Sequence, residues 1–209
     1  MLFYFNLLNS QSMEYTYDSL DRLTYVLHPD SSYIAYTYDA SGNRTRMTGI
    51  KSNIIKACPQ TNVTFQAGTD DPGNTYQWQV NVLNGFVDVI DDGVYSGAES
   101  AALLLTLPPT SWYGYKYRCV ITNNEGDSYS PVYTLKFEAR WLGSTDTAWE
   151  TASNWNCALL PDEYTDVMIS ATAKHFPEVN STAVCRSVSM QQLTSLLIKP
   201  PHNLEIKVE

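Results

Sequence analysis

Short runs of alternating apolar and polar residues, each ended by turn-forming residues, recur along this chain. Examples are Val63-Thr-Phe65-Gln-Ala67, Tyr76-Gln-Trp78-Gln-Val80 and Tyr115-Lys-Tyr117-Arg-Cys119-Val-Ile121, with breaks at Asp70-Asp-Pro72-Gly73-Asn74 and Asp92-Gly93. Successive side chains of a strand point to opposite faces, so this pattern predicts half-buried strands joined by tight turns. The chain has no long apolar pattern of period 3.6, and its many Tyr, Thr and Val residues suit a pleated sheet. We therefore predict an all-β protein.

The charge balance excludes several kinds of partner. Among the 209 residues, Asp and Glu outnumber Lys and Arg by 22 to 13, and no basic cluster interrupts the negative balance. Such a surface repels phosphate backbones and anionic membranes, so we expect no nucleic-acid partner. No stretch is long and apolar enough to span a bilayer, so we expect no membrane insertion. Residues 1–10 lack a basic region and a small-residue cleavage site and do not resemble a signal peptide.

A repeat with a spacing of 21 residues marks the first part of the chain. Tyr15-Thr-Tyr17-Asp18 recurs as Tyr36-Thr-Tyr38-Asp39, and the first copy has Asp21 where the second has Gly42. Tyr residues two apart share one face of a strand, and the Asp residues open turns. The segment His28–Ser32 supplies the turn between the copies. We therefore expect packing and turn formation, not ligand binding, from these Tyr and Asp residues.

This pattern resembles the Tyr-Asp (RHS) repeat over about residues 13–48. In that family, long arrays of β-hairpins spiral into a shell, which encloses a toxin in some members and decorates the cell envelope in others. Two copies are fewer than such an array needs to bury its faces. We therefore expect residues 1–50 to be a hairpin segment of a truncated array.

The middle segment, residues 54–138, has the pattern of a two-sheet sandwich. Trp78 occupies an inward position of one alternating run, and Tyr117 precedes Cys119 by two residues. Together with Gly93-Val-Tyr95-Ser-Gly97, these residues resemble the immunoglobulin-like domains of large Bacteroidota surface proteins. The resemblance implies that Trp78 is buried and that Tyr117 forms a tyrosine corner, whose hydroxyl ties down the preceding turn.

Two further features fit the sandwich. Leu103–Leu107 is expected to be a strand because Pro108-Pro109 follows it, although its Ala and Leu content leaves a helix as the alternative. Asn84-Gly85 marks a tight hairpin, and Val132–Phe137 is expected to be the last strand.

The four Cys residues, none arranged as CxxC, favour disulfides of an oxidising compartment over zinc ligands. In immunoglobulin domains the first Cys lies at the position that Ala67 occupies here. Cys58 lies nine residues earlier, and we expect it to pair with Cys119. The alternative is a free Cys119, buried against the sandwich Trp. Cys157 and Cys185 are the expected local pair.

The third segment, residues 139–209, has its own Trp-rich pattern. Trp141-Leu-Gly143, Asn154-Trp155 and Asp166-Val-Met-Ile169 resemble the opening of a module that precedes a parallel β-solenoid in bacterial surface proteins. Leu196–Ile198 and Leu204–Val208 are strand-like runs. An unpaired final strand exposes its backbone, so we expect the chain to be cut inside a longer protein.

Trp141, Trp149 and Trp155 lie within fifteen residues of one another. One hypothesis is that they stack on sugar rings. The other, which we favour, is that they form the small core of this module, because each indole buries a large area. Their exposure distinguishes the two.

The sequence carries no signature of catalysis. GxSxG, HExxH, Walker and GxGxxG motifs are absent, and His28, His175 and His202 are scattered over different segments. Asp70-Asp71 and Asp91-Asp92 adjoin Gly or Pro, where Asp caps turns rather than binding calcium. We expect no enzyme, no cofactor and no metal site.

Taken together, these resemblances predict a non-catalytic structural or adhesive module of a large secreted or cell-surface bacterial protein. Its expected partners are other modules of the same protein and a cell-surface protein or glycan. One alternative is a fragment of an RHS-type toxin-delivery shell. The other is a carbohydrate-binding accessory module of a surface enzyme that acts on polysaccharides.

Overall fold

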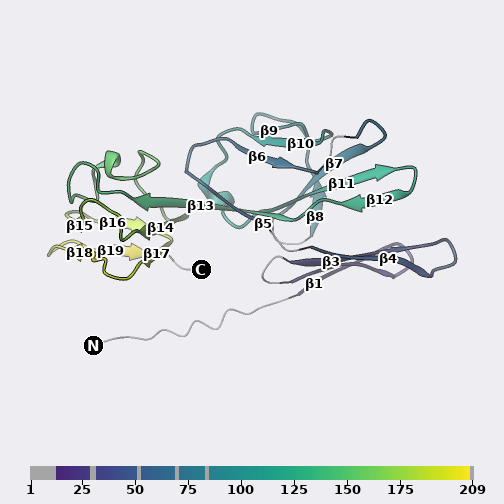
Figure 1. Cartoon of the computed structure of the whole chain (residues 1–209), viewed down its shortest axis with the longest axis horizontal. Coiled ribbons are helices and arrows are strands. Elements are labelled where there is room, and N and C mark those ends of the chain that lie inside the picture. Colours follow the sequence, from purple (N-terminus) through teal and green to yellow (C-terminus); the bar gives the residue numbers. More distant parts are fainter. Residues whose placement is uncertain (1–12, 29–31, 51–52, 69–70, 83–84, 208–209) are drawn as a thin grey trace. The chain divides into compact units, whose positions relative to one another are not determined.

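The structure is a computed structural model that describes residues 13–28, 32–50, 53–68, 71–82 and 85–207 (Figure 1). The chain divides into two compact units, Met1–Asn53 and Ile54–Glu209. The opening residues 1–10 and parts of the turns expected at His28–Ser32, Asp70-Asp71 and Asn84-Gly85 lie outside the described residues, as does Val208. Among those described, no helix is long and apolar enough to cross a bilayer.

The first unit is an antiparallel sheet of four strands in the order β1-β2-β3-β4. Its strands are β1 (Glu14–Tyr17), β2 (Leu23–Leu27), β3 (Tyr33–Tyr38) and β4 (Arg44–Ile50). Each copy of the repeat therefore ends one strand and turns into the next. Tyr25 and Tyr33 stack with ring centroids 4.8 Å apart, and both are buried.

The two repeat turns have the same hydrogen-bond pattern. The amide of Asp18 donates to the carbonyl of Arg22, and the amide of Asp39 donates to that of Asn43. Asp21 and Gly42 occupy the same place in the two turns, with φ of 57° and 85°. Only a left-handed backbone closes this turn, and Gly adopts it more readily than Asp.

Asp18 and Asp39 have the turn-forming roles that the sequence predicts. The carboxylate of Asp18 accepts hydrogen bonds from the amides of Leu20 and Arg22, and that of Asp39 accepts one from Asn43. These backbone hydrogen bonds lower the pKa of both carboxyl groups.

The second unit begins with a sandwich of two sheets. Its elements are β5 (Asn53–Ala57), β6 (Val63–Gln66), β7 (Thr75–Asn81), β8 (Phe86–Asp88), β9 (Tyr95–Ser96), β10 (Ala102–Leu105), the 3-10 helix η1 (Thr110–Trp112), β11 (Lys116–Asn123), β12 (Gly126–Tyr129) and β13 (Tyr133–Trp141). One sheet has the order β6-β10-β9, and the other contains β13-β11-β7-β8, with β12 beside β11 and β5 beside β13. Residues 102–105 form a strand, so the helical alternative there is wrong.

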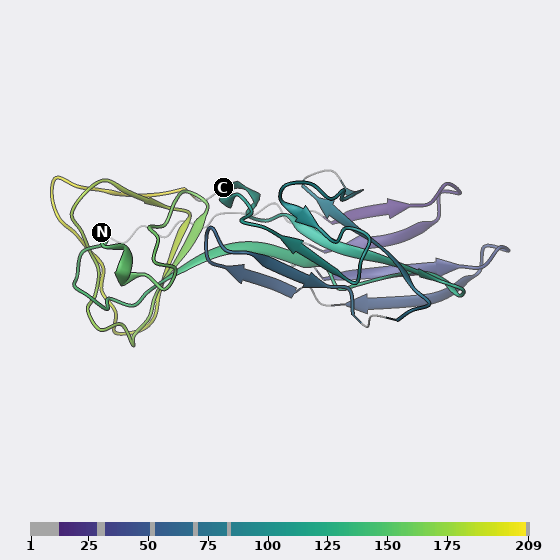
Figure 2. The same cartoon turned by 90° about the horizontal axis from the view of Figure 1, so that it is seen from above.

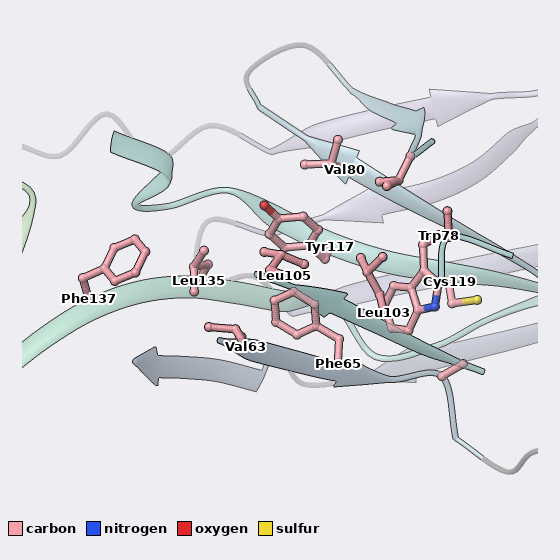
Figure 3. Packing of buried hydrophobic residues seen from close by; sticks show 13 residues of the cluster. Val63, Phe65, Trp78, Val80, Leu103, Leu105, Tyr117, Cys119, Leu135 and Phe137 are labelled. Atoms are coloured by element: carbon pink, nitrogen blue, oxygen red, sulfur yellow. The ribbon is translucent and has the colours of Figure 1, made fainter. Parts of the chain in front are cut away.

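The core of the sandwich forms where the two sheets face each other (Figure 3). Trp78 is fully buried, as the alternation predicts, and its Nε1 donates to the carbonyl of Ser100 at 2.9 Å. Phe65 of the facing sheet stacks on Tyr117 with centroids 4.7 Å apart. Cys119 lies directly opposite Trp78 in the pairing of β11 with β7.

Two expected details of the sandwich have different outcomes. The carboxylate of Asp92 accepts the amides of Val94 and Tyr95, which is the turn chemistry that the sequence predicts. The hydroxyl of Tyr117, in contrast, lies 3.3 Å from the hydroxyl of Tyr95 on the facing sheet. Within the described residues it does not bond to the preceding turn, so the expected tyrosine corner is wrong in its partner.

The remaining strands of the second unit pair in parallel. They are β14 (Thr165–Ile169), β15 (Glu178–Val179), β16 (Ala183–Cys185), β17 (Ser187–Met190), β18 (Leu197–Ile198) and β19 (Leu204–Ile206), with the 3-10 helix η2 (Ala152–Asn154) before them. β14 pairs with β17, β15 with β18 and β16 with β19, at offsets of 21, 19 and 21 residues. These strands form two coils of a three-sided parallel β-solenoid, whose outline is visible in Figure 2.

One strand, β13, belongs to both the sandwich and the solenoid. From Leu135 on, every second residue is buried: Leu135 and Phe137 enter the sandwich core, whereas Ala139 and Trp141 enter the solenoid core. Beyond Phe137, β13 pairs in parallel with β14. The boundary that the sequence suggests at 138/139 therefore lies inside a continuous strand, and the division into three modules stays a prediction.

Candidate functional site

The region where the sandwich meets the solenoid, here called the joint, holds a disulfide and two groups of polar contacts. A disulfide joins Cys58, just after β5, to Cys157, which follows η2. Both expected pairings, Cys58 with Cys119 and Cys157 with Cys185, are therefore wrong. Cys119 lies in the middle of β11 among core residues, and Cys58 lies past the end of β5, so the two are not neighbours.

Cys119 and Cys185 are free thiols inside the two cores. Burial raises the pKa of each thiol to about 11. Thiolate is the reactive form of Cys, so neither residue is a nucleophile near neutral pH. The alternative of a free Cys119 buried against Trp78 is confirmed.

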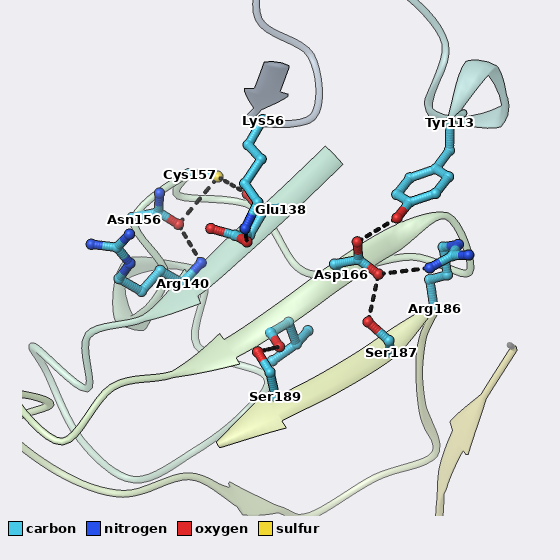
Figure 4. A network of polar contacts seen from close by, with 11 residues as sticks. Lys56, Tyr113, Glu138, Arg140, Asn156, Cys157, Asp166, Arg186, Ser187 and Ser189 are labelled. Atoms are coloured by element: carbon cyan, nitrogen blue, oxygen red, sulfur yellow. Dashed lines mark hydrogen bonds and ion pairs between the residues drawn. The ribbon is translucent and has the colours of Figure 1, made fainter. Parts of the chain in front are cut away.

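Polar contacts lie beside Cys157 (Figure 4). Lys56 of β5 forms an ion pair with Glu138 of β13. The side-chain oxygen of Asn156, next to Cys157, accepts the backbone amide of Arg140 at 2.6 Å. The loop that carries Cys157 is therefore held to β13 by hydrogen bonds and to Cys58, just after β5, by the disulfide.

A second polar cluster fastens the sandwich to strands β14 and β17. The carboxylate of Asp166 accepts the Tyr113 hydroxyl at 2.6 Å, the Arg186 guanidinium at 3.0 Å and the Ser187 hydroxyl. The Arg186 guanidinium also lies 4.0 Å from the centre of the Tyr113 ring. Tyr113 follows η1 in the sandwich, so this cluster joins residues that are more than fifty positions apart in the chain.

The ionisation of this cluster is fixed by its contacts. Burial alone raises the pKa of Asp166, but hydrogen bonds from Ser187, Tyr113 and Arg186, with the Arg186 charge, outweigh it and lower the pKa below its ordinary value. Burial raises the pKa of Tyr113, which stays a protonated donor. The cluster is thus a charged, fully paired contact at neutral pH, not a general acid or base.

A third contact lies beside an open hollow of about 610 Å³ at the joint. Its lining includes Pro59, Leu107, Leu160, Tyr164 and Asp162. The Asp162 carboxylate accepts the hydroxyls of Thr110 and Thr165 at 2.6 Å each, so it is already engaged. The hollow offers apolar contact area rather than reactive groups.

The three Trp residues of the third segment lie together inside the solenoid. Trp141, Trp149 and Trp155 are 0%, 2% and 2% exposed, and their ring centroids are 4.6–6.4 Å apart. The Nε1 of Trp141 donates to the carbonyl of His175 at 2.6 Å, and that of Trp155 donates to the carbonyl of Trp149 at 2.9 Å. No ring face is open to a sugar, and the burial of all three rings favours the core role over sugar stacking.

The part of the chain that the structure describes contains no group of three His, Cys, Asp or Glu residues that is suited to a metal ion. From the sequence, no contact or role follows for the side chains of Tyr113, Arg186 or Asp166, although Asp166 begins one of the strand-like runs named above. Each is an ordinary residue of a strand or loop, and only the tertiary fold brings the three together. A signal did exist for Cys58, whose distance from the expected strand position of Ala67 is too long for the usual sandwich disulfide.

The class of protein that these observations define is an immunoglobulin-like β-sandwich fused through one strand to two coils of a parallel β-solenoid. Residues 140–209, about a third of the chain, match the family model "Domain of unknown function (DUF8693)". This match begins within β13, at the start of the solenoid. No curated protein matches the chain.

Solved immunoglobulin-domain structures are similar to part of the chain. The N-terminal eight Ig domains of Down Syndrome Cell Adhesion Molecule isoform 1.30.30 share 14% identity at a TM-score of 0.36, over 52% of this chain and 17% of that one. The N-terminal four Ig domains of Dscam1 isoform 1.9 share 14% identity at a TM-score of 0.36, over 61% and 40%. The chain thus spans well under two thirds of these proteins, and likenesses this distant add nothing to the fold that the strands show.

Proposed function

We propose that this chain is a non-catalytic structural module of a large secreted or cell-surface bacterial protein, and that its joint holds the sandwich and the solenoid as one rigid body. The observation that carries the proposal is β13, which supplies alternate side chains to both cores. A continuous strand cannot bend freely between two cores that both bury it, so it fixes their relative direction.

The disulfide supports an oxidising compartment. Cytosolic proteins rarely keep a structural disulfide, whereas secreted domains commonly do. Cys58 and Cys157 also lie in different modules, so the bond constrains the joint rather than either core. A protein that presents a binding surface at a distance from the cell gains from such a joint, because its orientation persists under load.

Spin-label distances test the rigid joint in the full chain. Glu125→Cys, at the exposed tip between β11 and β12, and Leu193→Cys, on the exposed loop after β17, place one label on each module. The buried native thiols stay unlabelled. We expect one narrow distance distribution, as narrow as that of the control pair Glu125→Cys and Glu99→Cys within the sandwich. A broad distribution for the first pair alone would contradict the proposal.

A second candidate is a fragment of an RHS-type toxin-delivery shell, favoured by the matching turns at Asp18 and Asp39. The DNA sequence upstream of this reading frame distinguishes the two. A long array of Tyr-Asp repeats with a variable toxin domain would support the shell. Further immunoglobulin-like domains upstream would support the structural module instead.

A further inference from the structure

The disulfide connects two of the three loops that line the hollow of about 610 Å³ at the joint. Residues 59–60 of the first loop (58–62) follow Cys58 directly, and residues 159–160 of the second loop (156–162) follow Cys157 closely. The third loop, residues 107–111, leads from β10 into η1. The bond therefore fixes the distance between two walls of the hollow.

The first and second loops have few other direct links to each other. Each has a hydrogen bond to the third loop: the side-chain oxygen of Asn62 accepts the amide of Leu107 at 3.1 Å, and the Asp162 carboxylate accepts a hydroxyl of that loop at 2.6 Å. Within the described residues, one hydrogen bond joins the first loop to the second, from Asn156 Nδ2 to Cys58 Sγ at 3.6 Å. Sulfur is a weak acceptor, so the disulfide is the main direct link between these two walls.

Each of the three loops holds one non-Gly residue in the left-handed region of the backbone. These residues are Gln60, Leu107 and Ala158, with φ of 56°, 46° and 52°. A side chain crowds the backbone in this conformation, which persists only where the surroundings impose it. Gln60 lies two residues after one Cys of the disulfide, and Ala158 follows the other directly. Breaking the bond therefore allows both residues to relax.

The four Cys residues differ in their access to solvent. Cys58 and Cys157 are half-buried and lie next to exposed residues, whereas Cys119 and Cys185 are 0% exposed inside the two cores. Disulfide exchange needs a thiolate to approach one of the sulfur atoms. A reductant can therefore reach the disulfide without disturbing either core.

We propose that the disulfide between Cys58 and Cys157 is a redox latch for this hollow, which a dithiol reductant releases while both cores stay folded. The dithiol supplies two electrons and two protons: the S–S bond breaks, two thiols form on the chain, and the reductant closes to a disulfide. The first and second loops then move independently, and the hollow loses its fixed width. β13 continues through both cores in either state, so the latch acts beyond the rigid joint of the proposed function.

Hydrogen exchange of the full chain, before and after treatment with dithiothreitol, tests the proposal. The amide of Leu107 donates to Asn62, and that of Ala158 donates to the carbonyl of Trp155. We expect both amides to exchange at least about tenfold faster after reduction, because the loops then open locally. We expect this exchange to be independent of low urea, because local opening exposes little surface. Trp fluorescence and near-ultraviolet circular dichroism should not change.

Thiol labelling of the folded, reduced chain gives a second readout. We expect two equivalents of a thiol reagent to react, from Cys58 and Cys157. Cys119 and Cys185 should react only after denaturation. Re-oxidation should restore slow exchange at Leu107.

Two kinds of variant sharpen the test. Cys58→Ala with Cys157→Ala should exchange like the reduced wild type and should not respond to dithiothreitol. Gly adopts φ of 52° more readily than Ala, so we expect Ala158→Gly to need about two- to fivefold more dithiothreitol for half reduction. Ala171→Gly, in an exposed turn, is the matched control and should need the same amount as the wild type.

Two results would overturn the latch. Reduction that changes Trp fluorescence and near-ultraviolet circular dichroism would show that the bond holds the cores together, and exchange at Leu107 and Ala158 that stays unchanged would show that the loops do not open. A broad spin-label distance distribution in the oxidised chain would instead contradict the rigid joint, so the two proposals fail separately.

Discussion

The two cores of the second unit bury their side chains in different ways, although β13 serves both. In the sandwich, residues from two sheets meet face to face, as Phe65 and Trp78 do. In the solenoid, residues stack on their equivalents one coil away, as Ala139, Val167 and Val188 do in adjacent parallel strands. The sandwich thus closes on itself, whereas each coil depends on the next coil for burial.

This difference explains why the solenoid is held to the sandwich by a disulfide and by polar contacts. A short parallel solenoid is not expected to be stable alone, because its first coil needs a partner on both sides. The sandwich supplies that partner through β13, and the disulfide and the Asp166 cluster hold the next strands against it. The sandwich therefore provides the strand against which the first solenoid coil pairs.

The largest loss of stability is expected when the buried Trp of either core is replaced by Ala. We expect Trp78→Ala and Trp141→Ala each to lower the free energy of unfolding by about 3–5 kcal/mol, because each removes a fully buried indole and orphans a carbonyl acceptor. Urea unfolding of the full chain measures the loss. Trp112→Ala, at a partly buried ring at the margin of the sandwich core, is the control and is expected to cost less than either.

The same variants show whether the cores are coupled. If the lost stability of the solenoid core also destabilises the sandwich through β13, Trp141→Ala accelerates hydrogen exchange in β11 as well as in β14, because β13 pairs with both strands. If exchange in β11 stays at the wild-type rate while that in β14 rises, the two cores are not coupled and the sandwich is stable independently of the solenoid.

The next largest effect is expected from the disulfide. We expect Cys58→Ala with Cys157→Ala to lower the free energy of unfolding by about 2–4 kcal/mol, because the bond closes a loop of 99 residues in the unfolded chain. Urea unfolding with and without a reductant measures it. The reductant should destabilise the wild type and leave the double variant unchanged.

Thiol counting checks the connectivity on which that prediction depends. Under oxidising conditions the denatured wild type should react with two equivalents of a thiol reagent, from Cys119 and Cys185. Four reactive thiols, or none, would contradict the observed pairing.

The sandwich was more predictable from the sequence than the joint. Trp78, the 102–105 strand and the turn at Asp92 depend on local alternation and turn chemistry, which neighbouring residues reveal. The same holds for the turn at Asp18 in the first unit. The solenoid strands were only partly visible, because strands of two residues such as β15 and β18 are too short to show a period.

The joint was not predictable, because its partners are far apart in the chain. Cys58 and Cys157 are 99 residues apart, and Tyr113 and Asp166 are 53 apart. The immunoglobulin resemblance favoured a disulfide within the sandwich, and nothing local indicates that Cys58 lies past the sheet, next to another module. Such contacts follow from the path of β13 after Phe137, which only the structure shows.

The polar cluster around Asp166 is expected to contribute less to stability than the disulfide. We expect Asp166→Asn to lower the free energy of unfolding at pH 7 by about 1–3 kcal/mol, because it weakens hydrogen bonds to a charged, half-buried group. Urea unfolding measures it. Asp127→Asn, at an exposed site, is expected to change stability by less than about 0.5 kcal/mol.

The contribution of Asp166 to stability is expected to decrease as the pH falls. The pKa of Asp166 is lower in the folded protein than its ordinary value of 3.8, so its stabilising contribution is complete above that value. The contribution is lost as the pH falls through the lower, folded pKa. We therefore expect the gap between wild type and Asp166→Asn to narrow from pH 7 to pH 3, and a gap that widens would contradict the assignment of Asp166 as a paired carboxylate.

The smallest expected effect concerns the two repeat turns of the first unit, which differ at one position. We expect Asp21→Gly to raise the stability of the hairpin sheet by about 0.5–1 kcal/mol, because φ of 57° is strained for Asp. Gly42→Ala is the reciprocal change and should lower it by about 1 kcal/mol. A Cβ at Gly42 meets nothing within 4 Å, so that loss reports backbone strain and not a clash. Hydrogen exchange in β2 and β3 measures both variants, and shifts of the same sign would show that the two turns are not equivalent.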